Sequence, residues 1–402
     1  MRTTLWGAAI GLLLARSPVA AHAQAFTRAQ AIEAALARGP RSATVAADTL
    51  AAAAQWRSAR AFPNPRLTTE YTKDTPQYHL LVDLPLDLGG LRAARVQAAA
   101  ASREASQLRF TFDKASIRFD VDVAYTRAQA ASARAAISRR NADAADSLRL
   151  IAVARRDAGD ASDLEVELAA VNAGQQANAS AGDAFEAASA LLELGALVGR
   201  VSDEGPIALA DSLGPSSEWA STSRPGTPIL VDVATASLAA SEAALRQQRR
   251  STWLWPSLTA GFDFHDPGGT SGALPVVGIA IPLPLLDRNR GPILAATADR
   301  DRAAAALALA RIEADAGRRR AERASELASA RLVRDRTLLV SADRVAEMSL
   351  QAYREGALPL VAVLEAQRAA RDVLLQYIDD VVAARIAAAT LALVTLTAQQ
   401  VL

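Results

Sequence analysis

One pair of sequence signals occurs twice in this chain, at a constant offset of 197 residues. Leu84-Pro85-Leu86 recurs as Ile281-Pro282-Leu283, and Gly159 recurs as Gly356. Each proline-centred segment ends an alternating, strand-like stretch, and each glycine interrupts a long Ala-rich stretch with helical spacing. The chain is therefore expected to consist of two similar halves, residues 24–200 and 228–402, joined by a linker or equatorial segment at 201–227.

The N-terminus has the pattern of a secretory signal peptide over residues 1–23. Arg2 supplies the positive charge, Leu5 to Leu14 form a short apolar core, and Ala21-His22-Ala23 resembles a cleavage site. The apolar run is shorter than the roughly 20 residues that a membrane-spanning helix needs. We therefore expect cleavage and export from the cytoplasm.

Composition excludes several classes of function. The 402 residues include no cysteine, which excludes disulfides, thiolate metal sites and an N-terminal lipid on cysteine. The 44 basic and 43 acidic residues are well mixed and give a net charge of +1, which argues against nucleic acid as a partner. Ile386 to Ala398 is too short for a membrane helix, so an exported chain of this kind is either soluble or a β-barrel.

Four stretches alternate between apolar and polar residues, which predicts strands at about 66–72, 78–88, 257–265 and 275–285. One reading is an ordinary half-buried hairpin packed on helices. Strand lengths near the 9–11 residues that a tilted membrane strand needs, with aromatic residues near the strand ends, favour a membrane barrel instead. The residues expected to face lipid are Leu84, Leu86, Phe262, Ile279 and Ile281.

Four strands cannot close a membrane barrel, because roughly eight are the practical minimum. An open edge in lipid would leave backbone groups without hydrogen bonds. Two copies of the chain would give eight strands around a filled interior, and three would give twelve strands around a lumen. We therefore expect a homotrimer whose outer surface contacts outer-membrane lipid.

Two long helices are predicted at about 90–156 and 290–354. Their tips, at 157–162 and 355–359, contain helix-ending and helix-starting signals. Gly159 and Gly356 fit left-handed C-terminal caps. Ser162 to Glu165 fits a capping box, and Pro359 fits the first turn of a return helix. The fold class is therefore mainly α, with long helical hairpins and a four-stranded β contribution per chain.

Residues that would support catalysis are scarce. The three histidines are His22, His79 and His265, and none has the spacing of metal ligands. Phosphate loops, zinc motifs and nucleophile elbows are missing from the sequence. Arg318-Arg319-Arg320 is interpreted as a solvated helix face. We expect no enzyme activity, no cofactor and no bound metal.

Several motifs, in their order and spacing, resemble those of the TolC-type outer-membrane efflux protein family. The resemblance covers essentially all of the mature chain, and its second strand exit is similar to the metal-exporting (cobalt–zinc–cadmium type) branch. The matching segments are Asn64-Pro65-Arg66-Leu67, Trp255-Pro256-Ser257-Leu258, Leu84 to Gly90, Ile281 to Gly291, Tyr353-Arg354-Glu355-Gly356 and Val363-Leu364-Glu365-Ala366-Gln367.

The resemblance implies a trimeric conduit with a twelve-stranded outer-membrane β-barrel and a periplasmic α-barrel. Such proteins are passive and dock onto a periplasmic adaptor (a membrane fusion protein) and an inner-membrane pump. The implied adaptor contacts are Gly159, Asp160, Ser162, Asp163, Gly356 and Leu358. The implied residues of a periplasmic gate are Arg155, Arg156, Asp157, Arg354 and Glu355.

The leading hypothesis is thus an outer-membrane channel of a tripartite efflux system, extending into the periplasm, with heavy-metal cations as cargo. Two alternatives stay open at this point. The same channel could serve drug efflux or type I protein secretion. Otherwise the chain could be a soluble periplasmic coiled-coil scaffold or adaptor.

Overall fold

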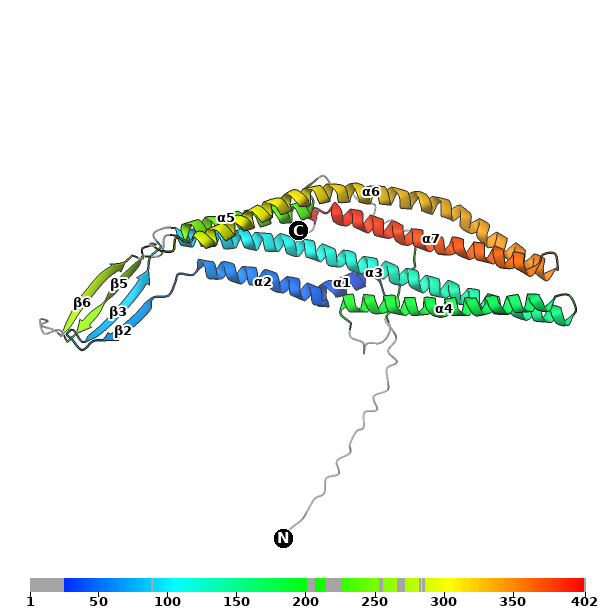
Figure 1. The fold of residues 1–402 in the computed structure, drawn as a ribbon, viewed down its shortest axis with the longest axis horizontal. Helices are drawn as coiled ribbons and strands as arrows, with labels where there is room; N and C mark the ends of the chain where they lie inside the picture. The colour runs from blue at the N-terminus through cyan, green and yellow to red at the C-terminus, as the bar shows by residue number, and fades with distance from the viewer. Residues whose placement is uncertain are drawn as a thin grey trace, which may run out of the picture.

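The computed structural model describes residues 25–87, 90–200, 207–214, 226–252, 256–265, 272–281, 283 and 286–400. The predicted signal peptide lies outside these residues, as do most of the 201–227 linker and parts of the predicted strand ends. The molecule is elongated, with a sheet at one end and two helical hairpin tips at the other (Figure 1). Among the described residues, no helix combines the length and apolar character that crossing a membrane demands.

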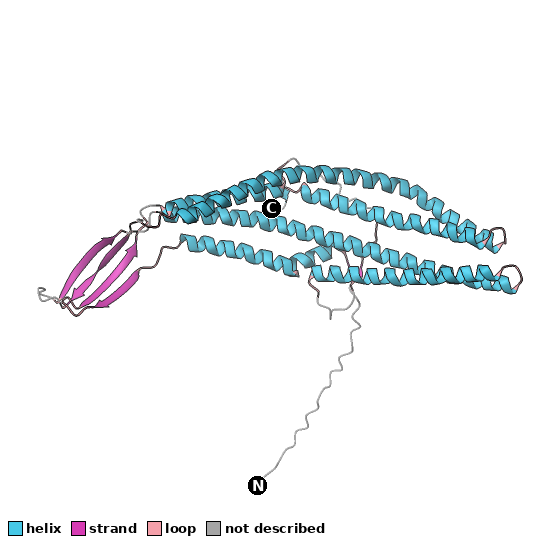
Figure 2. Cartoon of the chain, viewed as in Figure 1, coloured by secondary structure: helices cyan, strands magenta, loops and turns pink. Residues whose placement is uncertain are grey.

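The sheet contains four antiparallel strands in the order β2-β3-β5-β6 (Figure 2). Their bounds are Arg66–Tyr71 for β2, Tyr78–Pro85 for β3, Ser257–Phe264 for β5 and Ala273–Ala280 for β6. The two hairpins, far apart in sequence, meet where β3 pairs with β5. Strands β2 and β6 form the two edges of the sheet.

The register separates an apolar face from a polar one. Val82 pairs with Ala260, and Ala260 pairs with Val277, so these three side chains share a face. One residue along, Asp83, Thr259 and Gly278 share the opposite face. The apolar face is solvent-exposed in the single chain, with Val277 77% exposed.

Two predicted strand ends were wrong. Strand β3 ends at Pro85, so Leu86 lies after the strand and is half-buried. The Leu86 amide still donates to the Pro256 carbonyl at 2.7 Å, but Pro256 has no N–H to return a bond, so the pairing ends there. The Asp87 carboxylate then accepts hydrogen bonds from the Leu91 and Arg92 amides at the start of the next helix. Strand β6 runs from Ala273 to Ala280, earlier than predicted, and Ile281 follows it as an exposed residue outside the strand.

Four helices form the half of the molecule that ends in the tips, side by side in the order α4–α3–α7–α6 (Figure 1). Helix α3 spans Leu91–Asp157, α4 Asp163–Val198, α6 Arg290–Arg354 and α7 Leu360–Val394. Buried alanines on these helices, including Ala152, allow close packing of their backbones. Helices α4 and α6 lie at opposite edges of this layer.

Shorter helices lie in the half of the molecule nearer the sheet (Figure 1). Helix α2 (Pro40–Arg60) packs on α3, and α5 (Ile229–Arg250) packs between α3 and α6. Near the middle, α1 (Arg28–Arg38) follows β1 (Ala25–Phe26), which pairs with β4 (Ala208–Leu209) in parallel. A short 3₁₀ helix, Ala398–Gln400, follows α7.

Candidate functional site

The backbone at both helical hairpin tips has the same pattern of hydrogen bonds. After α3, the Gly159 amide donates to the Arg156 carbonyl and the Asp160 amide donates to the Arg155 carbonyl. After α6, the Gly356 amide donates to Tyr353 and the Ala357 amide to Ala352. This is the Schellman pattern, and it requires the left-handed φ values of 88° at Gly159 and 75° at Gly356.

One guanidinium connects the two tips. Arg155 Nη1 donates to the Tyr353 carbonyl oxygen at 3.1 Å, and Arg155 Nη2 donates to the Asp160 carbonyl oxygen at 3.3 Å. The guanidinium also lies over the Tyr353 ring, 4.8 Å from its centroid. Arg155 therefore bonds the two hairpins to each other. The spacing of residues in the sequence did not indicate this contact between α3 and the end of α6.

A small apolar cluster lies beneath this contact. Tyr353 is fully buried, together with Leu148 and Ala152 of α3 and Leu360 and Val363 of α7. Burial raises the pKa of the Tyr353 hydroxyl, and the nearby Glu165 carboxylate raises it further. The tips are thus joined by packing as well as by hydrogen bonds.

The other charged residues predicted for a gate are exposed. Arg156 pairs with Asp157 at 2.6 Å, and its hydrogen bond to that carboxylate raises the pKa of Arg156. Glu355 accepts a hydrogen bond from Gln351 at 3.0 Å. Arg354 makes no ion pair within the part of the chain that the structure describes. These side chains make contacts only within their own hairpin, whereas Arg155 bonds across to the other hairpin.

The residues predicted to meet a partner lie together at the end of the molecule. Gly159, Asp160, Ser162, Asp163, Gly356 and Leu358 are all exposed. Ser162 caps α4, its hydroxyl accepting from the Glu165 amide at 3.3 Å. The expected capping box is only half formed, because Glu165 Oε2 is buried without a hydrogen-bond partner. Pro359 is the N-cap of α7 and precedes its first residue, Leu360.

At the other end, three of the five residues predicted to face lipid lie in strands on the exposed apolar face. Ile279 is 68% exposed, and Leu84 and Phe262 are about half exposed. Leu84 and Ile279 both pair with Leu258, so they share one face. Leu86 and Ile281 fall outside the strands, as described above.

The polar face of the sheet contains a hydrogen bond between side chains that sequence analysis missed. His79 Nδ1 lies 2.7 Å from Asp263 Oδ1, although the two residues are 184 positions apart. On the same face, Thr259 donates to Asp83. A pairing of β3 with β5 brings these groups together, and no local motif predicts it. No cluster of three or more metal-ligand side chains occurs among the described residues.

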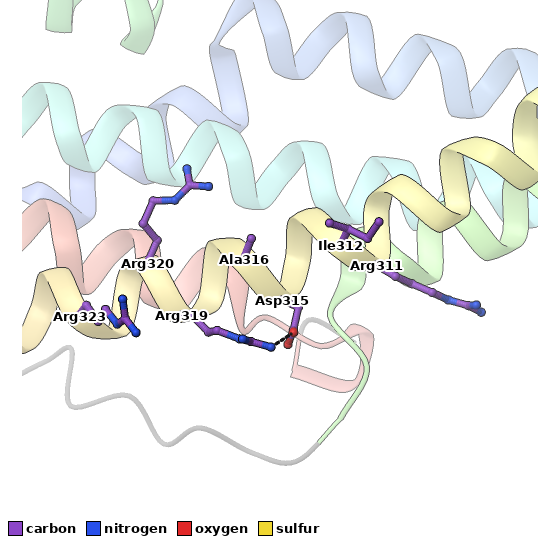
Figure 3. Close-up of a pocket in the computed structure, with 7 residues that line it drawn as sticks. All are labelled: Arg311, Ile312, Asp315, Ala316, Arg319, Arg320 and Arg323. Atoms are coloured by element: carbon purple, nitrogen blue, oxygen red, sulfur yellow. Dashed lines mark hydrogen bonds and ion pairs between the residues drawn. The ribbon is translucent and has the colours of Figure 1, made fainter.

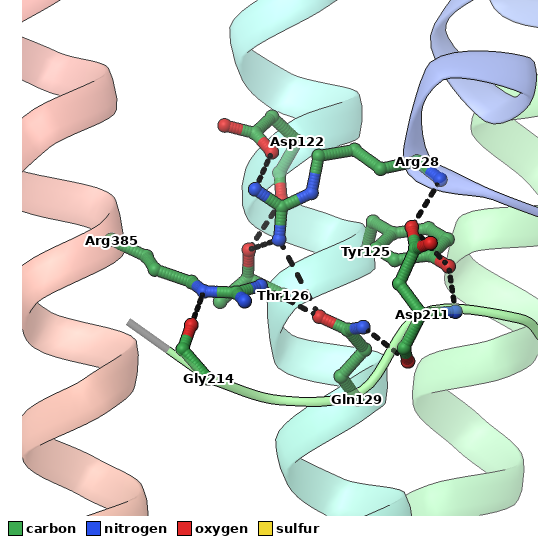
Figure 4. Close-up of polar contacts among 8 residues, drawn as sticks. All are labelled: Arg28, Asp122, Tyr125, Thr126, Gln129, Asp211, Gly214 and Arg385. Atoms are coloured by element: carbon green, nitrogen blue, oxygen red, sulfur yellow. Dashed lines mark hydrogen bonds and ion pairs between the residues drawn. The ribbon is translucent and has the colours of Figure 1, made fainter. Parts of the chain in front are cut away.

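A buried network of polar side chains joins the two sequence halves of the chain near the middle of its long axis (Figure 4). Arg28 Nη1 lies 3.1 Å from Asp122 Oδ1 on α3. The backbone amide of Arg28 donates to Asp211 Oδ2 at 2.7 Å. Arg385 on α7 donates to Gln129 on α3 at 2.8 Å and to the Gly214 carbonyl at 2.7 Å. Burial lowers the pKa of Arg385, and proximity to Arg28 lowers it further.

An arginine-lined hollow of about 740 Å³ lies on the exposed side of α6 (Figure 3). Its lining residues are Arg311, Ile312, Asp315, Ala316, Arg319, Arg320 and Arg323. Arg319 pairs with Asp315 at 2.5 Å, and its hydrogen bond lowers the pKa of that carboxyl group. The arginines of the run predicted as a solvated face are indeed exposed.

The chain resembles characterised metal-resistance proteins in sequence. It is 30% identical over 333 residues to the nickel-cobalt-cadmium resistance protein NccC of Alcaligenes xylosoxydans xylosoxydans, covering 78% of this chain and 73% of that protein. It is 31% identical over 258 residues to the cobalt-zinc-cadmium resistance protein CzcC of Cupriavidus metallidurans, covering 59% of this chain and 58% of CzcC. No family model matches.

The fold matches solved outer-membrane structures along nearly its whole length. The outer-membrane protein VceC of Vibrio cholerae superposes with a TM-score of 0.73 at 17% identity, covering 92% of this chain and 95% of VceC. The class of protein is therefore an outer-membrane efflux component. It is defined by the sheet at one end of the molecule, the two long helical hairpins and the similarities in sequence and fold given above. The chain belongs to the TolC-type outer-membrane efflux protein family, as its motifs predicted, and the predicted outer-membrane location is confirmed.

Proposed function

We propose that three copies of this chain form the outer-membrane channel of a tripartite exporter and conduct substrate passively. The observation that carries the proposal is the sheet itself. It presents an exposed apolar face and two unpaired edges at the end of an otherwise helical molecule. The coiled-coil scaffold alternative would require that face to pack on helices, and none of the described helices covers it.

Lipid is the environment that suits the apolar face. Val277, Ile279 and Leu67 are each more than 60% exposed on it, which is costly in water. Lipid in turn forbids open strand edges, so β2 of one copy must pair with β6 of the next. Three copies then give a closed barrel of twelve strands, with Asp83, His79 and Asp263 facing its lumen.

The helical part would continue this lumen into the periplasm. Each half of the chain runs in the order helix, strand pair, long helix and return helix, which supports an internal two-fold repeat. Three copies would close the four-helix layers into an α-barrel. The exposed tip residues would then meet the periplasmic adaptor, which connects the channel to an inner-membrane pump.

Gating would depend on the exposed tip charges. Arg156, Asp157, Arg354 and Glu355 remain candidates for contacts that differ between closed and open states. Arg155 fits that role less well, because it is already bonded within its own chain. Its function would be to keep the two hairpins of a copy moving together.

Heavy-metal cations are the proposed cargo, since the relatives NccC and CzcC are named for resistance to nickel, cobalt, zinc and cadmium. Selectivity would reside in the pump. The test is a deletion strain, whose minimal inhibitory concentrations of Ni²⁺, Co²⁺, Zn²⁺ and Cd²⁺ are expected to fall and to recover with the intact gene. Unchanged metal tolerance with increased sensitivity to drugs would assign the channel to drug efflux instead.

A further inference from the structure

Basic side chains gather where the sheet joins the helical part of the molecule. The end of α2, the start of α3, the end of α5 and the start of α6 meet there (Figure 1). We call this region, residues 56–62, 86–95, 246–252 and 286–290, the basic junction. It contains nine arginines, two aspartates and no other charged residue, a net charge of +7 in a chain whose total is +1. The segments that connect β2 to β3 and β5 to β6, at the other end of the sheet, contain one lysine and two aspartates. Of the two ends of the sheet, only the basic junction therefore has an excess of positive charge.

The two aspartates of the basic junction bind backbone amides. Asp87 accepts hydrogen bonds from the first amides of α3, and Asp287 accepts one from the Asn289 amide at 2.8 Å. Their carboxylates are thus used in starting the two long helices. The exposed arginines of the basic junction that form no ion pair with any residue that the structure describes are Arg57, Arg249, Arg288 and Arg290. Their charge is available to a negatively charged partner outside the chain.

Helix stability explains only some of these arginines. Arginine is favourable in the last turn of a helix, where the helix dipole is negative, and this accounts for Arg57 in α2 and Arg249 in α5. Arg288 and Arg290 lie at the start of α6, where the dipole is positive and arginine is unfavourable. The first turn of α6 contains no acidic residue that would offset this effect. An anion bound at this end of the helix would remove the unfavourable interaction.

Apolar and aromatic side chains accompany the arginines. Phe62 and Leu283 are each 69% exposed, and Leu286 is fully exposed. The Arg92 guanidinium lies 4.2 Å from the centroid of the Phe62 ring, and the Arg60 guanidinium lies 4.8 Å from that of the Trp56 ring. Exposed apolar side chains beside cationic ones suit the boundary between lipid chains and headgroups, where aromatic rings and arginines are favoured.

We infer that the basic junction binds the phosphate groups of anionic phospholipids in the periplasmic leaflet of the outer membrane. The inference rests on the proposed channel, in which the sheet crosses the membrane and the helices lie in the periplasm. The lipid class follows from charge. Phosphatidylethanolamine balances its phosphate with its own ammonium group, whereas phosphatidylglycerol and cardiolipin have a net negative charge. Each arginine near the membrane surface favours an anionic lipid by about fivefold.

The test measures which lipid the protein retains. The protein is reconstituted in vesicles of phosphatidylethanolamine and phosphatidylglycerol at a ratio of three to one and extracted in mild detergent, and the lipids that purify with it are quantified. The wild type is expected to enrich phosphatidylglycerol by about fivefold over the vesicle composition. The variant Arg57→Gln/Arg249→Gln/Arg288→Gln/Arg290→Gln is expected to lose most of this enrichment. Added salt should weaken the enrichment in the wild type, because it screens exposed charges.

The matched control removes the same charge far from the sheet. Arg311→Gln/Arg320→Gln/Arg323→Gln/Arg336→Gln changes four exposed arginines of α6 that lie about 30 Å or more along the helix from Arg290. This control should keep the enrichment. Lysine in place of glutamine at the four junction positions should also keep it, because the charge is unchanged.

Equal enrichment in the wild type and in the junction glutamine variant would overturn the inference. Displacement of phosphatidylglycerol by millimolar inorganic phosphate would also overturn it, because the site would then be one for small anions. A wild-type protein that inserts into the vesicles and retains both lipids in the vesicle proportion would overturn this inference and leave the channel proposal intact. A protein that does not insert at all would overturn both.

Discussion

The assigned faces of the sheet can be tested with two neighbouring residues. Val277 and Gly278 are adjacent in β6 and point to opposite faces. We predict that Val277→Asp blocks assembly of the barrel, whereas Gly278→Asp is tolerated. Gly278 has room for the change, because a Cβ there would lie 4.0 Å from the nearest side-chain atom.

The free-energy cost expected for each aspartate depends on how deep in the membrane it lies. Val277 pairs with Ala260 at the middle of the strands, and Val277 is 77% exposed on the apolar face. A carboxylate at mid-membrane costs about 2 kcal/mol per copy, which is about a thirtyfold factor for each of the three copies in the assembled state. Ile279→Asp lies nearer the membrane surface and is expected to cost less, because the penalty falls with distance from the centre.

The assay is the fraction of chain recovered from outer membranes as a heat-modifiable oligomer on electrophoresis, compared with total expression. The expected order of recovery is wild type and Gly278→Asp first, then Ile279→Asp, and Val277→Asp last. Equal recovery of Val277→Asp and Gly278→Asp would refute the assignment of the apolar face to lipid.

Three further predictions concern the helical part. Arg155→Ala should remove about 2 kcal/mol of contact between the hairpins and speed amide exchange around Tyr353, with Arg156→Ala as the neutral control. Arg385→Met should lower thermal stability by about 2 kcal/mol, because it leaves the Gly214 carbonyl oxygen without this hydrogen bond and removes one of the two that Gln129 Oε1 accepts; unchanged melting would contradict the network. Burial and the neighbouring Asp380 raise the pKa of Asp335, so stability from this group is present at acid pH and is lost as the pH rises through that pKa. Asp335→Asn should flatten this pH dependence of melting and raise the midpoint at neutral pH, whereas a lower midpoint would contradict it.

The turns and long helices could be predicted because their signals are local. Gly159 and Gly356 stop helices through their own backbone freedom, and the alanine-rich segments between breakers can hardly be anything but helix. Strand ends were harder, because they depend on residues outside the strand. Pro256, opposite Leu86, cannot donate a hydrogen bond, and Asp87 binds the first amides of α3, which alternation alone does not show.

Contacts between distant segments could not be predicted at all. The Arg155–Tyr353 contact, the His79–Asp263 pair and the Arg385–Gln129 hydrogen bond each join residues more than 180 positions apart. Each exists because β3 pairs with β5, because α3 lies beside α7, or because the ends of α3 and α6 meet at the tips, and these neighbours are set by tertiary packing. A single sequence contains no local trace of them.

The central claim is that the chain works as a trimer whose sheets close into one barrel. The mass of the protein component, measured by light scattering on protein extracted from outer membranes in mild detergent, tests it most directly. We predict a mass equal to three mature chains. A stable, detergent-free monomer would contradict the account, because one chain leaves the edges of β2 and β6 unpaired.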